Sequence, residues 1–199
     1  IGVTVGVFVA QAVTGRPSPV SSPLTEVGAY SPGHVLAGEV WRLVTCVFLH
    51  AGIFHIFCNM LILYWAGSRM EELYGSGEFL TFYLVGGVFA QLVYLLAQVG
   101  GVAPANPSVG ASGAVTAVMV LYAFHYPRQQ VLLFFVIPMP IWVLVVAYVG
   151  LDALGALGGG GGRVAYWVHI GGALFGTLYY QSGFRFGTLF GRGRGRRAE

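Results

Sequence analysis

The sequence predicts an all-α, polytopic membrane protein with six transmembrane helices, and three observations support this fold class. Only 9% of its 199 residues are charged, against about 25% in soluble domains. Hydrophobic residues make up 56% of the chain, more than a soluble domain can bury. Several uncharged stretches reach roughly 20 residues, the length a helix needs to cross a bilayer core. This composition excludes a soluble globular protein, a disordered chain and collagen.

Six apolar segments are expected to form the helices. Residues 1–15 are too short to cross the membrane alone and are interpreted as the remaining part of a first helix. A signal-peptide remnant is the alternative, because Ala10-Gln11-Ala12 looks like a cleavage site. The other helices are predicted within residues 43–68, 79–99, 110–124, 131–151 and 164–184, with a bend in the fifth at Pro138 and Pro140.

The arginines predict the orientation of the bundle, since basic residues flanking membrane spans favour the cytoplasm. Seven arginines fall on the side of the termini and three fall opposite: Arg69, Arg128, Arg185, Arg192, Arg194, Arg196 and Arg197 against Arg16, Arg42 and Arg163. Residues 1–185 are therefore expected to form one lipid-embedded domain with cytoplasmic termini, and residues 186–199 a basic cytoplasmic tail. The net charge of +3 is concentrated in that tail, so no nucleic-acid partner is expected.

Two connections on the outer side have distinctive compositions. Residues 16–42 form a long polar connection with four prolines, and long loops in compact proteins are often functional. Gly158 to Gly162 are five consecutive glycines, which predicts a mobile segment that could act as a lid.

Polar side chains inside the predicted spans gather near one depth below the outer surface. They are His50, His55, Asn59, Ser112 and His169, and such residues are costly in a bilayer and usually functional. His55 and Asn59 are four residues apart, so they project from one helix face as a pair of donors. Three separate helices are therefore expected to meet in one water-accessible pocket.

Glycines are expected to bring the serine and the last histidine together. Ser112 lies between Gly110 and Gly113 at a helix start, where free N–H groups favour negative charge. His169 begins the pattern His169-x-x-Gly172-x-x-x-Gly176, a small-residue face that allows another helix to approach closely. Close approach of these two helices would let the histidine activate the serine as a nucleophile.

Metal binding and transport are the alternatives from the residues alone. Cys46, His50, His55 and Cys58 share one region, and thiolate with imidazole suits zinc or copper. However, His50 and His55 are about 140° apart around a helix, and no acidic ligand lies near them. A transporter would be favoured by broken helices, but no inverted repeat is visible. We therefore expect no metal and no cofactor.

The motifs taken together resemble the rhomboid family of intramembrane serine proteases, over nearly the whole chain. In order they are Gly28-Ala29, Gly38-Glu39-x-Trp41-Arg42, His50-Ala51-x-x-x-His55-x-x-x-Asn59, Gly110-Ala111-Ser112-Gly113 and His169-x-x-Gly172-x-x-x-Gly176. The resemblance implies a six-helix rhomboid-like bundle, with a nucleophile, a general base, an oxyanion hole and a partly membrane-embedded first outer loop. It implies Ser112 as the nucleophile and His169 as the general base. The implied oxyanion hole consists of His55, Asn59 and the Ser112 backbone N–H, with Gly110 lining the site. The resemblance further implies that His50, Trp41 and Arg42 order the loop.

The resemblance also implies the reaction, which is cleavage of a transmembrane protein substrate near the outer boundary of the membrane. A Ser–His dyad is expected without an acid, because Asp152 is assigned to the end of the fifth helix. Several family members carry a tyrosine four residues after the serine, whereas this chain has Thr116. The alternative within the family is a catalytically inactive protein that binds membrane clients. The sequence predicts no particular oligomeric state.

Overall fold

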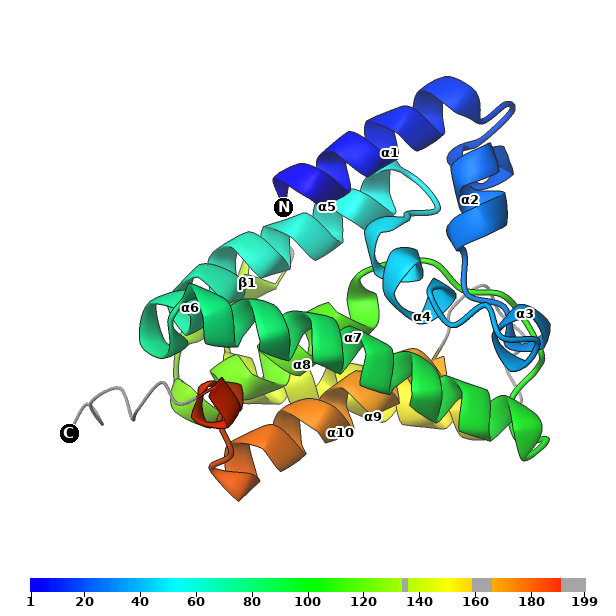
Figure 1. Cartoon of the computed structure of the whole chain (residues 1–199). Coiled ribbons are helices and arrows are strands. Elements are labelled where there is room, and N and C mark those ends of the chain that lie inside the picture. Colours follow the sequence, from blue (N-terminus) through cyan, green and yellow to red (C-terminus); the bar gives the residue numbers. More distant parts are fainter. Residues whose placement is uncertain (134–135, 159–165, 191–199) are drawn as a thin grey trace.

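A computed structural model describes residues 1–133, 136–158 and 166–190 and shows a mostly helical bundle (Figure 1). Its elements are, in chain order, α1 (Gly2–Thr14), η1 (Pro19–Ser21), α2 (Pro23–Gly28), α3 (Pro32–Leu36), α4 (Arg42–Thr45), η2 (Cys46–Phe48), α5 (Ile53–Ile62), the π-helical η3 (Leu63–Gly67), α6 (Ser68–Tyr74), α7 (Ser76–Val99), α8 (Ser112–His125), β1 (Gln130–Leu133), β2 (Ile137–Pro140), α9 (Ile141–Leu157), α10 (Tyr166–Ser182) and η4 (Phe186–Phe190). The expectation of a mostly helical fold is confirmed.

By length and composition, one helix of the described residues can cross a bilayer by itself. This helix is α7, with 24 residues. The segments Arg42–Phe48 and Ile53–Tyr74 qualify together as a second, broken span, bent by 94°. The helices α1, α8 and α9 are apolar but shorter. The count of six spans stays a prediction.

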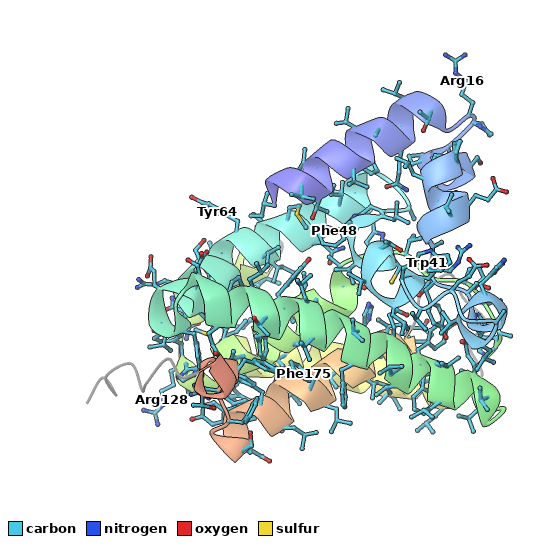
Figure 2. All side chains as sticks on the ribbon, in the orientation of Figure 1. Arg16, Trp41, Phe48, Tyr64, Arg128 and Phe175 are labelled. Atoms are coloured by element: carbon cyan, nitrogen blue, oxygen red, sulfur yellow. The ribbon has the colours of Figure 1, made fainter. Side chains whose placement is uncertain are left out.

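Helix α8 lies at the centre of the bundle, packed by α7, α9 and α10. Its sequence is apolar on every side, as is typical of a fully buried helix, and every residue from Gly113 to Ala123 is buried. Phe175 of α10, labelled in Figure 2, packs against α7, and its ring centroid lies 5.2 Å from that of Phe82 in α7. The helix that begins with Ser112 is thus held by protein on all faces.

The predicted close approach of the fourth and sixth helices is confirmed. A Cβ added at Gly172 of α10 would lie 2.1 Å from the carbonyl oxygen of Gly113 in α8. One turn further on, a Cβ at Gly176 would lie 2.6 Å from the carbonyl oxygen of Ala117. Only glycine allows this backbone-to-backbone contact.

The predicted second helix is broken between η2 and α5, so His50 lies in the break and not on a helix. The free backbone groups of the break find partners elsewhere. The His50 N–H donates to Oε1 of Gln11 at 3.0 Å, and the Cys46 carbonyl accepts from the Gly110 N–H at 2.9 Å. These partners stabilise the break because they satisfy backbone groups that have no partner within a helix.

The predicted fifth helix begins ten residues later than expected, and the predicted bend at its prolines is wrong. The strands β1 and β2, Gln130–Leu133 and Ile137–Pro140, instead pair as the antiparallel strands of a hairpin, with Gln130 opposite Pro140. Pro138 and Pro140 lack the N–H that a helix interior needs. Because they are two residues apart, both can lie in a strand with their nitrogens toward its open edge.

The two ends of the bundle carry two arginines that the sequence analysis assigns to opposite sides of the membrane. In Figure 2, Arg16 and Arg128 lie at opposite ends of the bundle. The first residues of the predicted tail pack against α7, since the N–H groups of Phe186 and Gly187 donate to the Glu78 carboxylate at 2.8 and 2.7 Å. The predicted glycine lid from Gly159 onward and the tail arginines from Arg192 lie outside the described residues.

Candidate active site

Ser112 and His169 meet where α8 begins. The His169 Nε2 atom lies 2.9 Å from the Ser112 Oγ atom. Ser112 is half-buried at the first position of α8, and His169 lies on the first turn of α10, buried among side chains. Their contact follows from the glycine contact one turn away, because Gly172 fixes the spacing of the two helices.

Two side chains of α9 contact the other nitrogen of the same imidazole. Asp152 Oδ2 lies 2.9 Å from His169 Nδ1, and the Tyr148 hydroxyl lies 2.8 Å from it. Asp152 is only 5% exposed. The expectation that no acid lies beside His169 is wrong, since α9 extends to Leu157 and Asp152 lies within it. The late start of α9 after the hairpin shifts the helix along the sequence and brings this carboxylate to the histidine.

Tyr148 takes the place of the tyrosine that the sequence lacks after the serine. Its ring centroid lies 5.4 Å from that of His169, with the ring planes tilted by 32°. Thr116, at the position expected for the tyrosine, donates instead to the Ser112 carbonyl within its own helix at 2.8 Å. The contact with the histidine ring therefore comes from α9, not from α8.

A cavity of about 1100 Å³ opens beside this cluster. Its lining includes His55, Asn59, Ser112, Tyr148 and His169, so the structure brings together both predicted pairs. The Asn59 Nδ2 atom donates one hydrogen to the His55 carbonyl at 2.9 Å, and an amide nitrogen carries a second hydrogen. Polar donors and the serine thus share one solvent-accessible space.

The His55 ring packs directly on Gly110. Gly110 has a φ of +130°, which favours glycine, and an added Cβ would lie 2.6 Å from His55 Cε1. The Ala51 N–H donates to His55 Nδ1 at 3.4 Å, which assigns the ring proton to Nε2. Gly110 therefore allows the histidine ring to lie against the segment that carries the serine.

His50 is fully buried behind His55. The two rings meet edge to face with centroids 5.0 Å apart. The Ala111 N–H donates to His50 Nε2 at 3.5 Å. His50 thus contacts both the second histidine and the residue that precedes Ser112.

The loop formed by residues 16–42 is held together by Arg42. Its guanidinium donates to the carbonyls of Glu26 and Ala29 at 2.8 and 2.9 Å and pairs with Glu39 at 2.7 Å. The Trp41 indole donates to the Val27 carbonyl at 3.2 Å. These contacts agree with the ordering role that the resemblance implies for both residues.

A two-way backbone bridge joins this loop to the segment before the serine. Tyr30 and Ser108 exchange N–H to carbonyl hydrogen bonds, both of 3.0 Å. The Tyr30 hydroxyl also donates to Gln98 Oε1 at 2.6 Å. Burial raises the pKa of the Tyr30 phenol, so this group stays a protonated donor.

The sequence analysis assigned no role at the site to four residues that contribute to it: Gln11, Gln91, Tyr148 and Asp152. Gln11 is fully buried and donates from Nε2 to Thr25 Oγ1 at 2.8 Å while holding the His50 N–H. Gln91 accepts from the Ser108 hydroxyl at 3.0 Å. A signal was present, because amides and acids are rare within apolar helices.

The part of the chain that the structure describes offers no set of ligands for the metal site that the sequence leaves as an alternative. Within residues 1–133, 136–158 and 166–190, no group of three or more His, Cys, Asp or Glu side chains could hold a metal ion. Cys46 and Cys58 are both free thiols.

An apolar helical bundle in which a serine is hydrogen-bonded to a histidine defines a class of protein, namely membrane proteins with a site like that of a serine hydrolase. Comparison with known proteins specifies that class further. Residues 37–186 match the Rhomboid domain. The chain belongs to the rhomboid family, whose members are integral membrane proteins and typically intramembrane serine proteases.

Curated relatives come from plants, yeast and bacteria. The chain is 33% identical over 150 residues to RHOMBOID-like protein 12, mitochondrial, of Arabidopsis thaliana, covering 69% of this chain and 44% of that protein. It is 31% identical over 140 residues to Rhomboid protein 1, mitochondrial, of Saccharomyces cerevisiae, covering 69% and 40%. It is 38% identical over 92 residues to Rhomboid protease GluP of Bacillus subtilis, covering 46% and 17%. The chain thus spans less than half the length of these relatives.

Proposed function

We propose that this chain is the membrane domain of an intramembrane serine endopeptidase in which Ser112 is the nucleophile and His169 the general base. One observation carries the proposal: the 2.9 Å contact between His169 Nε2 and Ser112 Oγ at the wall of a cavity that also contains His55 and Asn59. Membership of the rhomboid family supports it.

The proposed reaction hydrolyses a peptide bond in two stages. The Ser112 oxygen attacks the scissile carbonyl carbon as its proton passes to His169 Nε2. The carbon–nitrogen bond then breaks, and His169 returns the proton to the leaving amine. Water, deprotonated by His169, releases the acyl group as a carboxylic acid and restores the serine. No step needs a metal or a cofactor.

The oxyanion of the tetrahedral intermediate would be stabilised by donors around the cavity. The candidates are His55 Nε2, the second amide hydrogen of Asn59 and the Ser112 backbone N–H. The last belongs to the first turn of α8, whose N–H groups have no partner within the helix, and the helix dipole there favours negative charge. One such donor contributes about 3–4 kcal/mol to transition-state stabilisation in other serine hydrolases.

The proposed substrate is a segment of another transmembrane protein. A membrane-spanning helix satisfies its own backbone hydrogen bonds, so it must unwind before a serine can reach a carbonyl. Substrates with Gly, Pro or polar residues near the outer boundary are therefore favoured. With both termini in the cytoplasm, as the arginines predict, the cavity would open toward the outer side of the membrane.

Labelling by a fluorophosphonate tests the proposal directly. The wild-type chain in detergent or liposomes should react at Ser112 and cleave a transmembrane substrate, whereas Ser112→Ala and His169→Ala should both lose cleavage, and Ser112→Ala should keep the wild-type melting temperature. Ser182→Ala is the matched control, because Ser182 is an exposed serine near the end of α10, and it should behave as wild type. More than a tenth of wild-type turnover in Ser112→Ala would eliminate Ser112 as the nucleophile.

A further inference from the structure

We propose that Asp152 is a positioning residue that fixes the tautomer and orientation of the His169 ring, so that the site contains three acting groups and not two. The inference rests on the proposed function and deepens it. Asp152 Oδ2 lies 2.9 Å from His169 Nδ1, on the side of the ring opposite Ser112. The carboxylate is buried, with 7% of its side chain exposed.

The tautomer decides whether His169 can act as a base. A neutral imidazole carries one proton, so Nε2 can accept the proton of Ser112 only if Nδ1 carries the ring hydrogen. The Tyr148 hydroxyl, 2.8 Å from Nδ1, can either donate or accept and therefore does not select a tautomer. An ionised carboxylate can only accept. Asp152 thus selects the Nδ1–H form, the one in which Nε2 accepts from the serine.

The same contact stabilises the charge that forms during the reaction. When the Ser112 proton moves to Nε2, the ring becomes an imidazolium between the serine and the carboxylate. Asp152 takes no proton; the proton stays on His169 until it passes to the leaving amine. Because the pair is buried, the attraction between the two charges is stronger than it would be in water.

The place of Asp152 in the chain supports a functional role. It is the only acidic or basic residue between Arg128 and Arg163 in the sequence, and an acid inside an apolar helix is costly unless it has a partner. Among the described residues, His169 is its one ion-pair partner. A residue without such a role could be replaced by any of the apolar types that fill the rest of α9.

The packing of α9 against α10 maintains this geometry. Tyr148 and Asp152 are four residues apart, so they share one helix face. Less than one turn further on, a Cβ added at Gly155 would lie 2.7 Å from the Tyr166 ring, at the start of α10. The close contact at Gly155 therefore holds the Asp152 face of α9 against the turn that carries His169.

Asp152→Asn provides the test, because the amide has nearly the same shape and loses only the charge. We expect kcat to fall by about 10²- to 10⁴-fold with KM within about threefold of wild type, and the rate of fluorophosphonate labelling to fall with it. Tyr148→Phe should lose less than about tenfold, since the carboxylate remains. Leu151→Ala is the matched control: Leu151 is the neighbour of Asp152 in α9 but 69% exposed, and this variant should keep wild-type kinetics.

The tautomer itself is read by ¹⁵N NMR of histidine-labelled protein in detergent, with His169 assigned from a His169→Gln sample. The wild type should carry the proton on Nδ1, and Asp152→Asn should shift the population toward Nε2–H. A merely structural role would lower the melting temperature of Asp152→Asn without moving this signature. Wild-type kcat in Asp152→Asn, or an Nε2–H ring in the wild type, overturns the inference. If the wild type neither cleaves nor labels, the proposed function fails, while the ¹⁵N spectra still decide the role of Asp152.

Discussion

Replacing Gly172 with alanine should separate the two helices that carry Ser112 and His169. An added Cβ would lie 2.1 Å from the Gly113 carbonyl oxygen, whereas real Cβ atoms essentially never approach within 3.0 Å. Neither atom can rotate away, because the Cβ is fixed to one helix backbone and the oxygen belongs to the other. We therefore expect α10 to move away from α8 by about 1 Å, the shift that brings the contact to 3.0 Å. The close-packed interior has no void that could absorb the added Cβ without this shift.

The size of the effect follows from the distance between Gly172 and His169. Three residues of helix correspond to about 4.5 Å along the axis, so nearly the whole displacement reaches the imidazole. The 2.9 Å separation of Nε2 and Oγ then exceeds the range of a hydrogen bond. A misplacement of 1 Å costs about 10²-fold in rate, and overpacking costs about 1–3 kcal/mol in the free energy of unfolding.

The assay combines fluorophosphonate labelling of the serine with a thermal melt in detergent. Gly172→Ala should show both a lower labelling rate and a lower melting temperature than the wild type. Gly150→Ala is the matched control, because Gly150 also lies in a helix but no atom comes within 4 Å of an added Cβ. Wild-type labelling and melting in Gly172→Ala would refute the close backbone contact as the element that sets the site.

Three further predictions concern the donors, the loop and metal. Asn59→Ala and His55→Ala should each lower kcat and kcat/KM together by about 10- to 1,000-fold with KM unchanged, as expected for donors to transition-state charge; an increase in KM alone would assign both to substrate binding. Arg42→Ala should lower the free energy of unfolding by about 2–4 kcal/mol, because two carbonyls and Glu39 lose their donor, and a thermal melt equal to wild type would contradict this. EDTA or phenanthroline should leave cleavage unchanged, and a loss that zinc restores would show that a metal takes part.

The meeting of Ser112 with His169 could be predicted because its causes are local in the sequence. The glycines at positions 172 and 176 share a helix face by their spacing, and the glycines around Ser112 provide the matching surface. A pattern of this kind specifies which faces meet without knowledge of the loops. The same holds for His55 and Asn59, whose spacing places them on one side of α5.

Asp152 was missed because the position of a helix within an apolar run is not set by hydrophobicity. The uncharged run from residue 131 to 151 has the length of a span, but β1 and β2 occupy its first part and α9 begins at Ile141. Two prolines in that run favour a strand over a helix bend, and the pairing with β1 that decides the matter is a tertiary contact. Gln11 was missed for a related reason, because its partner His50 is 39 residues away.

The bridge between Tyr30 and Ser108 links residues 16–42 to the segment before Ser112, so we expect the two segments to open together in local unfolding. The amides of Tyr30 and Ser108 are bonded across the two segments, so they should exchange with deuterium together, at a free energy below that of global unfolding. Each opening of these segments frees the residues that precede the serine while the buried helices stay folded. We therefore expect the geometry around Ser112 to depend on the stability of residues 16–42, which a ligand bound to that segment would raise.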